Sequence, residues 1–361
     1  MVLLAMLPAC GNNGPKDPPG TKYGTFVDVT FSSSSVVPLT SLTWSSNLDI
    51  DTDGSTMCDT HNDQASRFCV VAGSSITLAS GATLRAHGSK PLVLLATSTS
   101  KLKGTIDLEG TIDVSSKHDG SPPGAGAAAL ADCPNTTAAT GNSGSFGGSF
   151  GGAGGNGSLV DGAMGTGAPA LTAFPMTLRG GCPGGAGSST TAGTAPAGGN
   201  GGGAVLIITE SLQINGTINA SGAAGHGGPA TKSGGGGGGS GGMIVIDVKP
   251  EAVMPGAGPI LLFANGGGGG QGGTDTGVGV GAGDDGGESP DPMTPGAGGK
   301  NIGRSGGTGG IGSAGAKNDG AKAGNAINSG GGGGGGGAAG FIFTPPIAGA
   351  LIAPLVTSPF P

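Results

Sequence analysis

Apolar and polar residues alternate with a period of two in several short blocks of the chain. The longest region, 74–116, reads SSITLASGATLRAHGSKPLVLLATSTSKLKGTIDLEGTIDVSS, and Gly, Ser and Pro separate its blocks. Similar blocks follow at 204–222, at 243–266 and at 341–343. Alternation over a few residues rich in β-branched side chains is typical of β-strands, and no block keeps a helical period over three turns. The pattern therefore predicts an all-β chain with almost no α-helix.

The blocks share phrases that indicate an internal repeat. GTIDVSS begins at Gly110, GTINASG at Gly216 and GPILLFANG at Gly258, and each later block follows a glycine run. Repeats that cannot bury a face alone stack on their neighbours, which predicts an irregular parallel β-solenoid with a β-helix-like form. The glycine-rich excursions then leave the coil on one side. The expected inward-facing side chains are Ile106, Ile112, Ile214, Ile218, Ile244 and Ile246.

Glycine runs, the longest being 330–337, allow two interpretations. The chain has 86 Gly and 25 Pro in 361 residues, a composition that normally indicates disorder, but it is 35% hydrophobic and only 10% charged. Glycine can form an extended three-residue helix, in which the eight-residue run spans roughly 25 Å, and such helices can hydrogen-bond to one another. Ordering costs about 1–2 kcal/mol per residue, so only a bundle pinned by strands stays ordered. Flexible linkers are the alternative.

The N-terminal sequence MVLLAMLPACGNNGPKDPPG resembles the lipobox of bacterial lipoproteins. A short apolar run ends in Leu-Pro-Ala-Cys, which makes Cys10 the expected lipidation site, and a Pro/Gly-rich tether follows. No Lys or Arg precedes the run, so we expect a start codon further upstream. An apolar beginning of a cytosolic protein is the alternative.

The other four cysteines form an even set, which favours export to an oxidising compartment. Cys58 and Cys69 flank a short polar loop, and Cys133 and Cys182 lie in similar Gly/Pro contexts, so we predict the disulfides Cys58–Cys69 and Cys133–Cys182. Zinc is the competing interpretation, but no C-x-x-C pair supplies its ligands.

Several phrases together suggest a family. GATLRAHGSKPLVLLA, GTIDVSS, LRGGCPGGAG, GTINASG and FANGGGGG resemble the glycine-rich surface lipoproteins of predatory soil bacteria, sometimes labelled PGRS-like. The resemblance covers most of the chain from about Ile76 onward. It implies a location at the outer membrane or cell surface and a repeat architecture, and it transfers no catalytic residue.

The predicted organisation has five parts. Residues 1–9 are a signal remnant, 10–22 a tether, and 23–117 an N-terminal β region containing the first disulfide loop. Residues 118–203 are a glycine-rich excursion, and 204–361 alternate between solenoid strands and further excursions.

The one local signal for a metal is DIDTDG. Asp49, Asp51 and Asp53 alternate before Gly54, as in the first half of a calcium-binding EF-hand loop, but Thr60 stands where the bidentate Glu is required. A weak structural calcium site is one interpretation, and a solvated acidic turn is the other. We identify no cofactor-binding or catalytic residue. The three G-x-S-x-G matches precede no helix and are expected from composition in a chain this rich in glycine.

These features favour an exported, lipid-anchored surface protein with a structural, adhesive or matrix role and no enzymatic activity. The expected partners are the membrane, through the anchor, and surface polysaccharide or other surface proteins. A net charge of −7 argues against nucleic acid. A carbohydrate-active solenoid enzyme is the alternative, and it requires stacked carboxylates such as Asp107, Asp113 and Asp247. Ice binding is a remote third possibility, because the threonines of SSTTAGTAP at 188–196 lack regular spacing.

Overall fold

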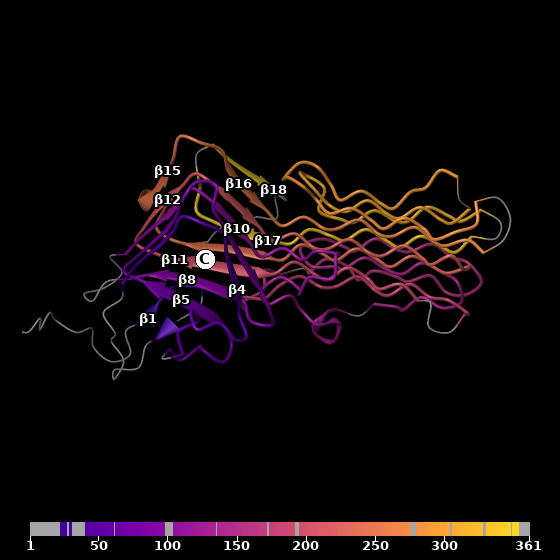
Figure 1. Ribbon diagram of the computed structural model, residues 1–361, viewed down its shortest axis with the longest axis horizontal. Helices are drawn as coiled ribbons and strands as arrows, with labels where there is room; N and C mark the ends of the chain where they lie inside the picture. The colour runs from indigo at the N-terminus through magenta and orange to yellow at the C-terminus, as the bar shows by residue number, and fades with distance from the viewer. Residues whose placement is uncertain are drawn as a thin grey trace, which may run out of the picture.

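The computed structural model places the strands at one end of an elongated molecule and the glycine-rich segments at the other (Figure 1). It describes residues 22–26, 29–30, 40–60, 62–97, 104–134, 136–171, 173–191, 195–275, 279–303, 305–327, 330–347 and 349–353. None of the described residues is in an α-helix, as the alternating pattern predicts. The only helical turns described are two 3₁₀ turns, η1 (Leu130–Asp132) and η2 (Pro250–Ala252).

Each turn of the solenoid adds one strand to each of three parallel sheets. The first sheet contains β3 (Ser41–Trp44), β6 (Ser75–Leu78), β9 (Thr105–Leu108), β12 (Ser211–Ile214) and β15 (Val253–Pro255). The second contains β4 (Leu48–Asp51), β7 (Thr83–His87), β10 (Thr111–Asp113), β13 (Thr217–Asn219), β16 (Ile260–Phe263) and β18 (Ala350–Ala353). The third contains β5 (Cys69–Gly73), β8 (Leu92–Ala96), β11 (Ala204–Ile208), β14 (Met243–Asp247) and β17 (Phe341–Phe343). The predicted parallel β-solenoid is therefore confirmed.

The repeated phrases align in the second sheet. Ile112 of GTIDVSS pairs with Ile218 of GTINASG, and Ile218 pairs with Leu262 of GPILLFANG. All six isoleucines that we expected to face inward belong to one buried core. Because these side chains repeat at equivalent strand positions, a shift of one residue would turn each of them out of the core.

The third sheet is buried on both faces, which explains why its strands are continuously apolar rather than alternating. One face joins the solenoid core, and the other belongs to a second cluster that contains Phe150, Phe341 and Phe343. Phe174 packs edge-on against Phe341, with ring centroids 5.2 Å apart. Parallel strands covered on both sides have this composition.

The three long glycine-rich excursions leave the solenoid at the same corner, between the second and third sheets. Residues 114–203 connect β10 to β11, 220–242 connect β13 to β14, and 264–340 connect β16 to β17. They extend together away from the strands (Figure 1). Strands on both sides of the first excursion pair with each other, so our regions 23–117 and 204–361 contribute to one continuous solenoid.

The N-terminal segment is fastened to the third sheet. β1 (Lys22–Tyr23) pairs antiparallel with β2 (Val29–Thr30). The backbone N–H of Thr25 donates to the Asp247 carboxylate, and the Thr25 hydroxyl donates to it at 2.9 Å. The N–H of Phe26 donates to the same carboxylate at 3.1 Å, and its ring stands edge-on to Phe174. This fixes where the chain enters the fold.

Candidate functional site

The excursions form a bundle of parallel and antiparallel extended segments held together by backbone hydrogen bonds. The segment 234–242 lies in the middle and is buried throughout. Its N–H groups donate in rotation to three neighbouring segments, at N···O distances of 2.7 to 2.9 Å; these are 182–188, 220–226 and 332–338. Its carbonyls accept from three others, which are 145–148, 199–202 and 267–270. Each neighbour receives a hydrogen bond from every third residue of the segment, so the segment is a helix with three residues per turn.

A second segment, 330–340, has the same environment. Its N–H groups donate to 142–148, 264–273 and 318–321. Its carbonyls accept from 151–158, 235–241 and 307–313. Two adjacent helices with six hydrogen-bonded neighbours each define a close-packed bundle, and no glycine of the runs 234–239 and 330–337 has a positive φ. In this structure the two glycine runs are therefore ordered helices and not flexible linkers.

Glycine is required in this bundle because neighbouring backbones occupy the space of a side chain. A Cβ atom at Gly238 would lie 2.1 Å from the carbonyl oxygen of Gly267, and one at Gly335 would lie 2.0 Å from that of Gly155. Removing the side chain lets the helices approach to hydrogen-bonding distance, as in collagen. The solenoid sets this spacing at the base of the bundle, where Gly203 donates to Val114 and Gly242 donates to Ala220.

The second predicted disulfide joins two parts of the first excursion. Cys133 and Cys182 are bonded at 2.08 Å, and the Arg179 guanidinium lies 3.4 Å from the Cys182 sulfur. Arg179 also donates to the carbonyl of Asp132 at 3.0 Å, and it lies over the Phe150 ring at 5.3 Å. Burial lowers the pKa of Arg179, and the charge of Asp132 opposes that shift. The disulfide and Arg179 therefore lie beside the second hydrophobic cluster, which contains Phe150.

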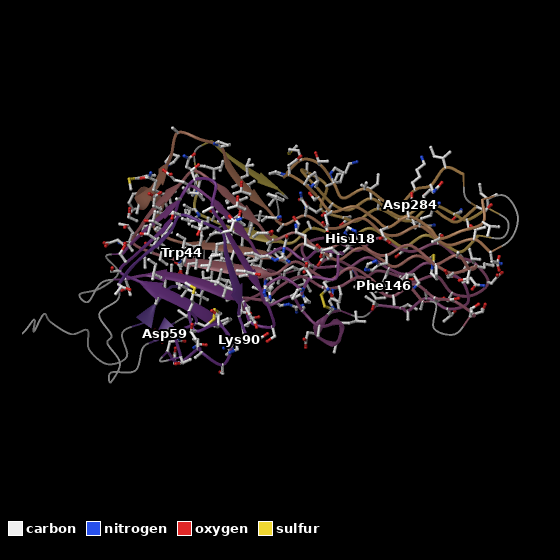
Figure 2. The ribbon with its side chains drawn as sticks, viewed as in Figure 1. Trp44, Asp59, Lys90, His118, Phe146 and Asp284 are labelled. Atoms are coloured by element: carbon white, nitrogen blue, oxygen red, sulfur yellow. A yellow bond between two sulfur atoms is a disulfide. The ribbon has the colours of Figure 1, made fainter. Side chains whose placement is uncertain are left out.

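Two histidine–carboxylate pairs connect the three excursions on the side of the bundle. His118 of the first excursion lies 3.0 Å from Glu288 of the third, and its backbone N–H donates to the same carboxylate at 2.7 Å. His226 of the second excursion lies 3.7 Å from Asp285 of the third. The two imidazole rings are edge-on, with centroids 6.1 Å apart. Figure 2 shows His118 midway along the molecule. These residues tie the outer layer of the bundle to the inner ones.

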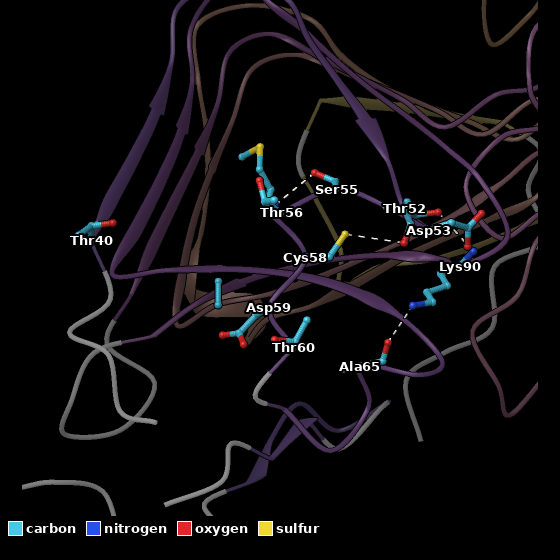
Figure 3. Close-up of a pocket in the computed structure, with 13 residues that line it drawn as sticks. Thr40, Thr52, Asp53, Ser55, Thr56, Cys58, Asp59, Thr60, Ala65 and Lys90 are labelled. Carbon is cyan, nitrogen blue, oxygen red and sulfur yellow. Dashed lines mark hydrogen bonds between the residues drawn. The ribbon is translucent and has the colours of Figure 1, made fainter. Parts of the chain in front are cut away.

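An open cleft of about 650 Å³ lies beside the first disulfide loop (Figure 3). Cys58 and Cys69 are bonded at 2.01 Å, as predicted. Thr52, Ser55 and Thr56 line the cleft together with Asp53, Asp59 and Lys90. The Lys90 ammonium donates to the carbonyl of Ala65 at 3.1 Å.

Three of the residues that line this cleft are engaged by partners in the local fold. Asp53 accepts hydrogen bonds from the backbone and the hydroxyl of Ser89, which lower its pKa, and Lys90 is held by a carbonyl. Cys58, the one sulfur nucleophile that lines it, is consumed in the disulfide. Asp53, Lys90 and Cys58 are therefore each engaged within the local fold of the cleft.

The calcium prediction gains no support. Asp49 faces His87 at 3.4 Å, the Asp51 carboxylate accepts the Asp53 N–H at 3.0 Å, and Asp53 is held by Ser89. Across the described residues, no three His, Cys, Asp or Glu side chains are arranged to hold a metal ion. The spacing of two places Asp49 and Asp51 on β4 and Asp53 just after its end, where each carboxylate is engaged by these local partners. Cys10 lies outside the described residues.

The carboxylates required by the enzyme hypothesis are separated. Asp107 lies on β9, Asp113 on β10 and Asp247 on β14, so each belongs to a different sheet. Asp113 accepts from Ser115, and Asp247 holds the N-terminal segment. Burial, assisted by Glu109, raises the pKa of Asp107. These three residues therefore do not build the single groove that a glycosidase or lyase needs.

The threonines of SSTTAGTAP do not make a flat rank where the structure describes them. Ser188 donates to the carbonyl of Gly141 at 3.0 Å, and Thr190 donates to Asn142 through its N–H at 3.0 Å. Ser188 and Thr190 are therefore engaged in local hydrogen bonds with the segment 141–142.

Comparisons of the chain with known protein families, curated proteins and solved structures gave no match. The two disulfides indicate an oxidising compartment outside the cytoplasm. No helix in the part of the chain that the structure describes has the length and apolar character needed to span a bilayer.

Proposed function

We propose that this chain is an exported, lipid-anchored surface protein whose glycine-helix bundle is a rigid module for structural and adhesive contacts, without enzymatic activity. The observation that supports this most is the bundle itself. Its two central helices, 234–242 and 330–340, each bond to six neighbours, and each continues at one end into a solenoid strand, β14 or β17. A module built from buried backbone hydrogen bonds resists local opening more than mobile loops do.

The geometry also suits a role at a distance from the anchor. The fastened segment at Thr25 and Phe26 lies at the strand end of the molecule, and the bundle extends the other way (Figure 1). A tether of about a dozen residues that begins at a lipidated Cys10 would hold the solenoid near the membrane. The far turns of the bundle would then face outward, toward surface polysaccharide or other surface proteins.

The test is expression in a Gram-negative host of the full chain behind a lipoprotein leader, followed by acyl labelling and surface-protease accessibility. The wild type should be labelled and surface-exposed, and Cys10→Ala should be neither. Cell aggregation is then compared between the wild type and Gly335→Val, which keeps the anchor but disrupts the bundle. Loss of adhesion with retained labelling supports the proposal. An unlabelled wild type refutes the anchor, and unchanged adhesion in Gly335→Val refutes the role of the bundle.

A further inference from the structure

The far end of the bundle exposes aliphatic side chains on neighbouring turns. Leu159 is 60% exposed, Val280 55%, Ile302 90% and Ile327 65%. Each lies in or beside a turn where a segment that runs away from the solenoid ends and a segment that runs back toward it begins. We call these four residues the distal tip.

Backbone hydrogen bonds show that the turns of the distal tip are adjacent. The N–H of Ile327 donates to the carbonyl of Ser305 at 2.8 Å, which brings its turn beside the turn of Ile302. The N–H of Gly330 donates to Ile327, and Gly330 also bridges to Thr274, where the turn of Val280 begins. The fourth turn lies at the same end of helix 330–340, because Ser158, next to Leu159, donates to Gly333 at 3.0 Å. The exposed side chains therefore share one end of the molecule.

The charge of these turns differs from that of the rest of the chain. By sequence the four turns carry two basic and two acidic residues, and the neighbouring turn that holds Lys232 adds a third basic one, whereas the whole chain has a net charge of −7. The described charges include an ion pair between Lys232 and Asp161 and an exposed Lys300. The excess negative charge thus lies outside the distal tip, and this end of the molecule meets an anionic or neutral surface without repulsion.

We propose that the distal tip inserts into the interface of a lipid bilayer. The tip consists of turns whose separated aliphatic side chains stand among Ser, Thr, Asn and Gly. A protein partner would need a matching surface for each side chain, whereas a lipid interface admits them between headgroups and leaves the polar turns in water. Burial of apolar area in the headgroup region supplies the attraction, and basic residues add to it on anionic lipid.

This inference rests on the proposed surface role and extends it. A chain anchored through Cys10 at one end and bound to lipid at the distal tip would bridge two membranes. The rigid bundle would set the distance between them. Lipid binding by the tip needs no anchor, so it is tested separately from lipidation.

The experiment is vesicle flotation with the full-length oxidised chain carrying Cys10→Ser. Vesicles of phosphatidylcholine alone and of phosphatidylcholine mixed with phosphatidylglycerol are both used. The chain should float with both and more strongly with the anionic mixture. The pair Ile302→Ser and Ile327→Ser should weaken binding at least about tenfold, because two buried aliphatic side chains are lost.

The matched control is Ile311→Ser. Ile311 is 50% exposed but lies along the bundle, where its carbonyl accepts from Ala321, and about 19 Å of helix separates that level from the tip. It should float like the wild type. Wild-type chain that stays at the bottom of the gradient overturns the inference, as does an equal loss in the control. Sedimentation velocity without vesicles tests the other occupant. If the wild type self-associates and the double variant Ile302→Ser and Ile327→Ser does not, the distal tip binds a second copy of the chain, and the inference is overturned.

Discussion

Replacing Gly238 by alanine tests whether the bundle is packed as tightly as its hydrogen bonds require. The new Cβ atom would lie 2.1 Å from the carbonyl oxygen of Gly267, and Cβ atoms essentially never approach closer than 3.0 Å. The two helices must therefore separate by about 0.9 Å at this level. The bonds on either side, from Gly267 to Gly239 at 2.9 Å and from Gly270 to Gly236 at 2.8 Å, would then be broken.

The expected loss of stability follows from these two bonds. Breaking one buried hydrogen bond without a replacement costs about 1–3 kcal/mol, so the two bonds together cost about 2–6 kcal/mol. Alanine has less conformational entropy than glycine in the unfolded chain, which reduces this loss of stability by about 0.4–1 kcal/mol. We expect the Gly238→Ala bundle to be less stable by about 1–5.6 kcal/mol.

The assay is amide hydrogen exchange of the segment 234–242, because the bundle can open without the solenoid. A loss of 2 kcal/mol raises the exchange rate about 30-fold, since about 1.4 kcal/mol corresponds to a factor of ten. Gly303→Ala is the control, because its Cβ would have no neighbour closer than 3.6 Å and Gly303 has no positive φ. Exchange in Gly238→Ala that matches Gly303→Ala would refute the close packing of helices.

Three further changes give distinct outcomes. Replacing Cys133 and Cys182 by serine removes a link of sequence separation 49 and should lower the free energy of unfolding by about 4 kcal/mol, measured by denaturation with and without reductant. Asp247→Asn should release the N-terminal segment and speed its cleavage in limited proteolysis, while Trp44 fluorescence and the solenoid stay unchanged. In Ser89→Ala the pKa of the Asp53 carboxyl should rise toward its ordinary value, which carbon NMR can measure. In the wild type the folded pKa of Asp53 is depressed, so the stability that this carboxylate contributes is present above about pH 4 and is lost as pH falls through the folded pKa.

The solenoid register could be predicted because its signal is local and repeated. GTIDVSS and GTINASG place isoleucine at the same point of each turn, and Ile112 indeed pairs with Ile218. Both disulfides were predictable from cysteine count and context. The distribution of glycine runs between strands also indicated a bundle, although it left flexible linkers as the alternative.

The arrangement within the bundle could not be predicted from the sequence. A glycine run has no side chain to specify its neighbour, so nothing in 234–242 identifies 332–338 as an acceptor and 267–270 as a donor. The link between His118 and Glu288 was missed for a related reason, because the two residues are 170 positions apart and meet only through the packing of separate excursions. The aspartates at 49–53 leave two interpretations open, since their ligand-like spacing is also that of alternate residues on the strand β4 and at its exit.

The most direct test of the ordered bundle is residue-resolved amide exchange by NMR on the oxidised wild-type chain. It compares Gly235, Gly238 and Gly241, which donate to the 332–338 helix, with the amides of β11 (Ala204–Ile208). The account predicts that the three glycines are as strongly protected as the strand. Exchange of the three glycines at the rate of an unstructured peptide would contradict it and make the runs linkers on a small solenoid.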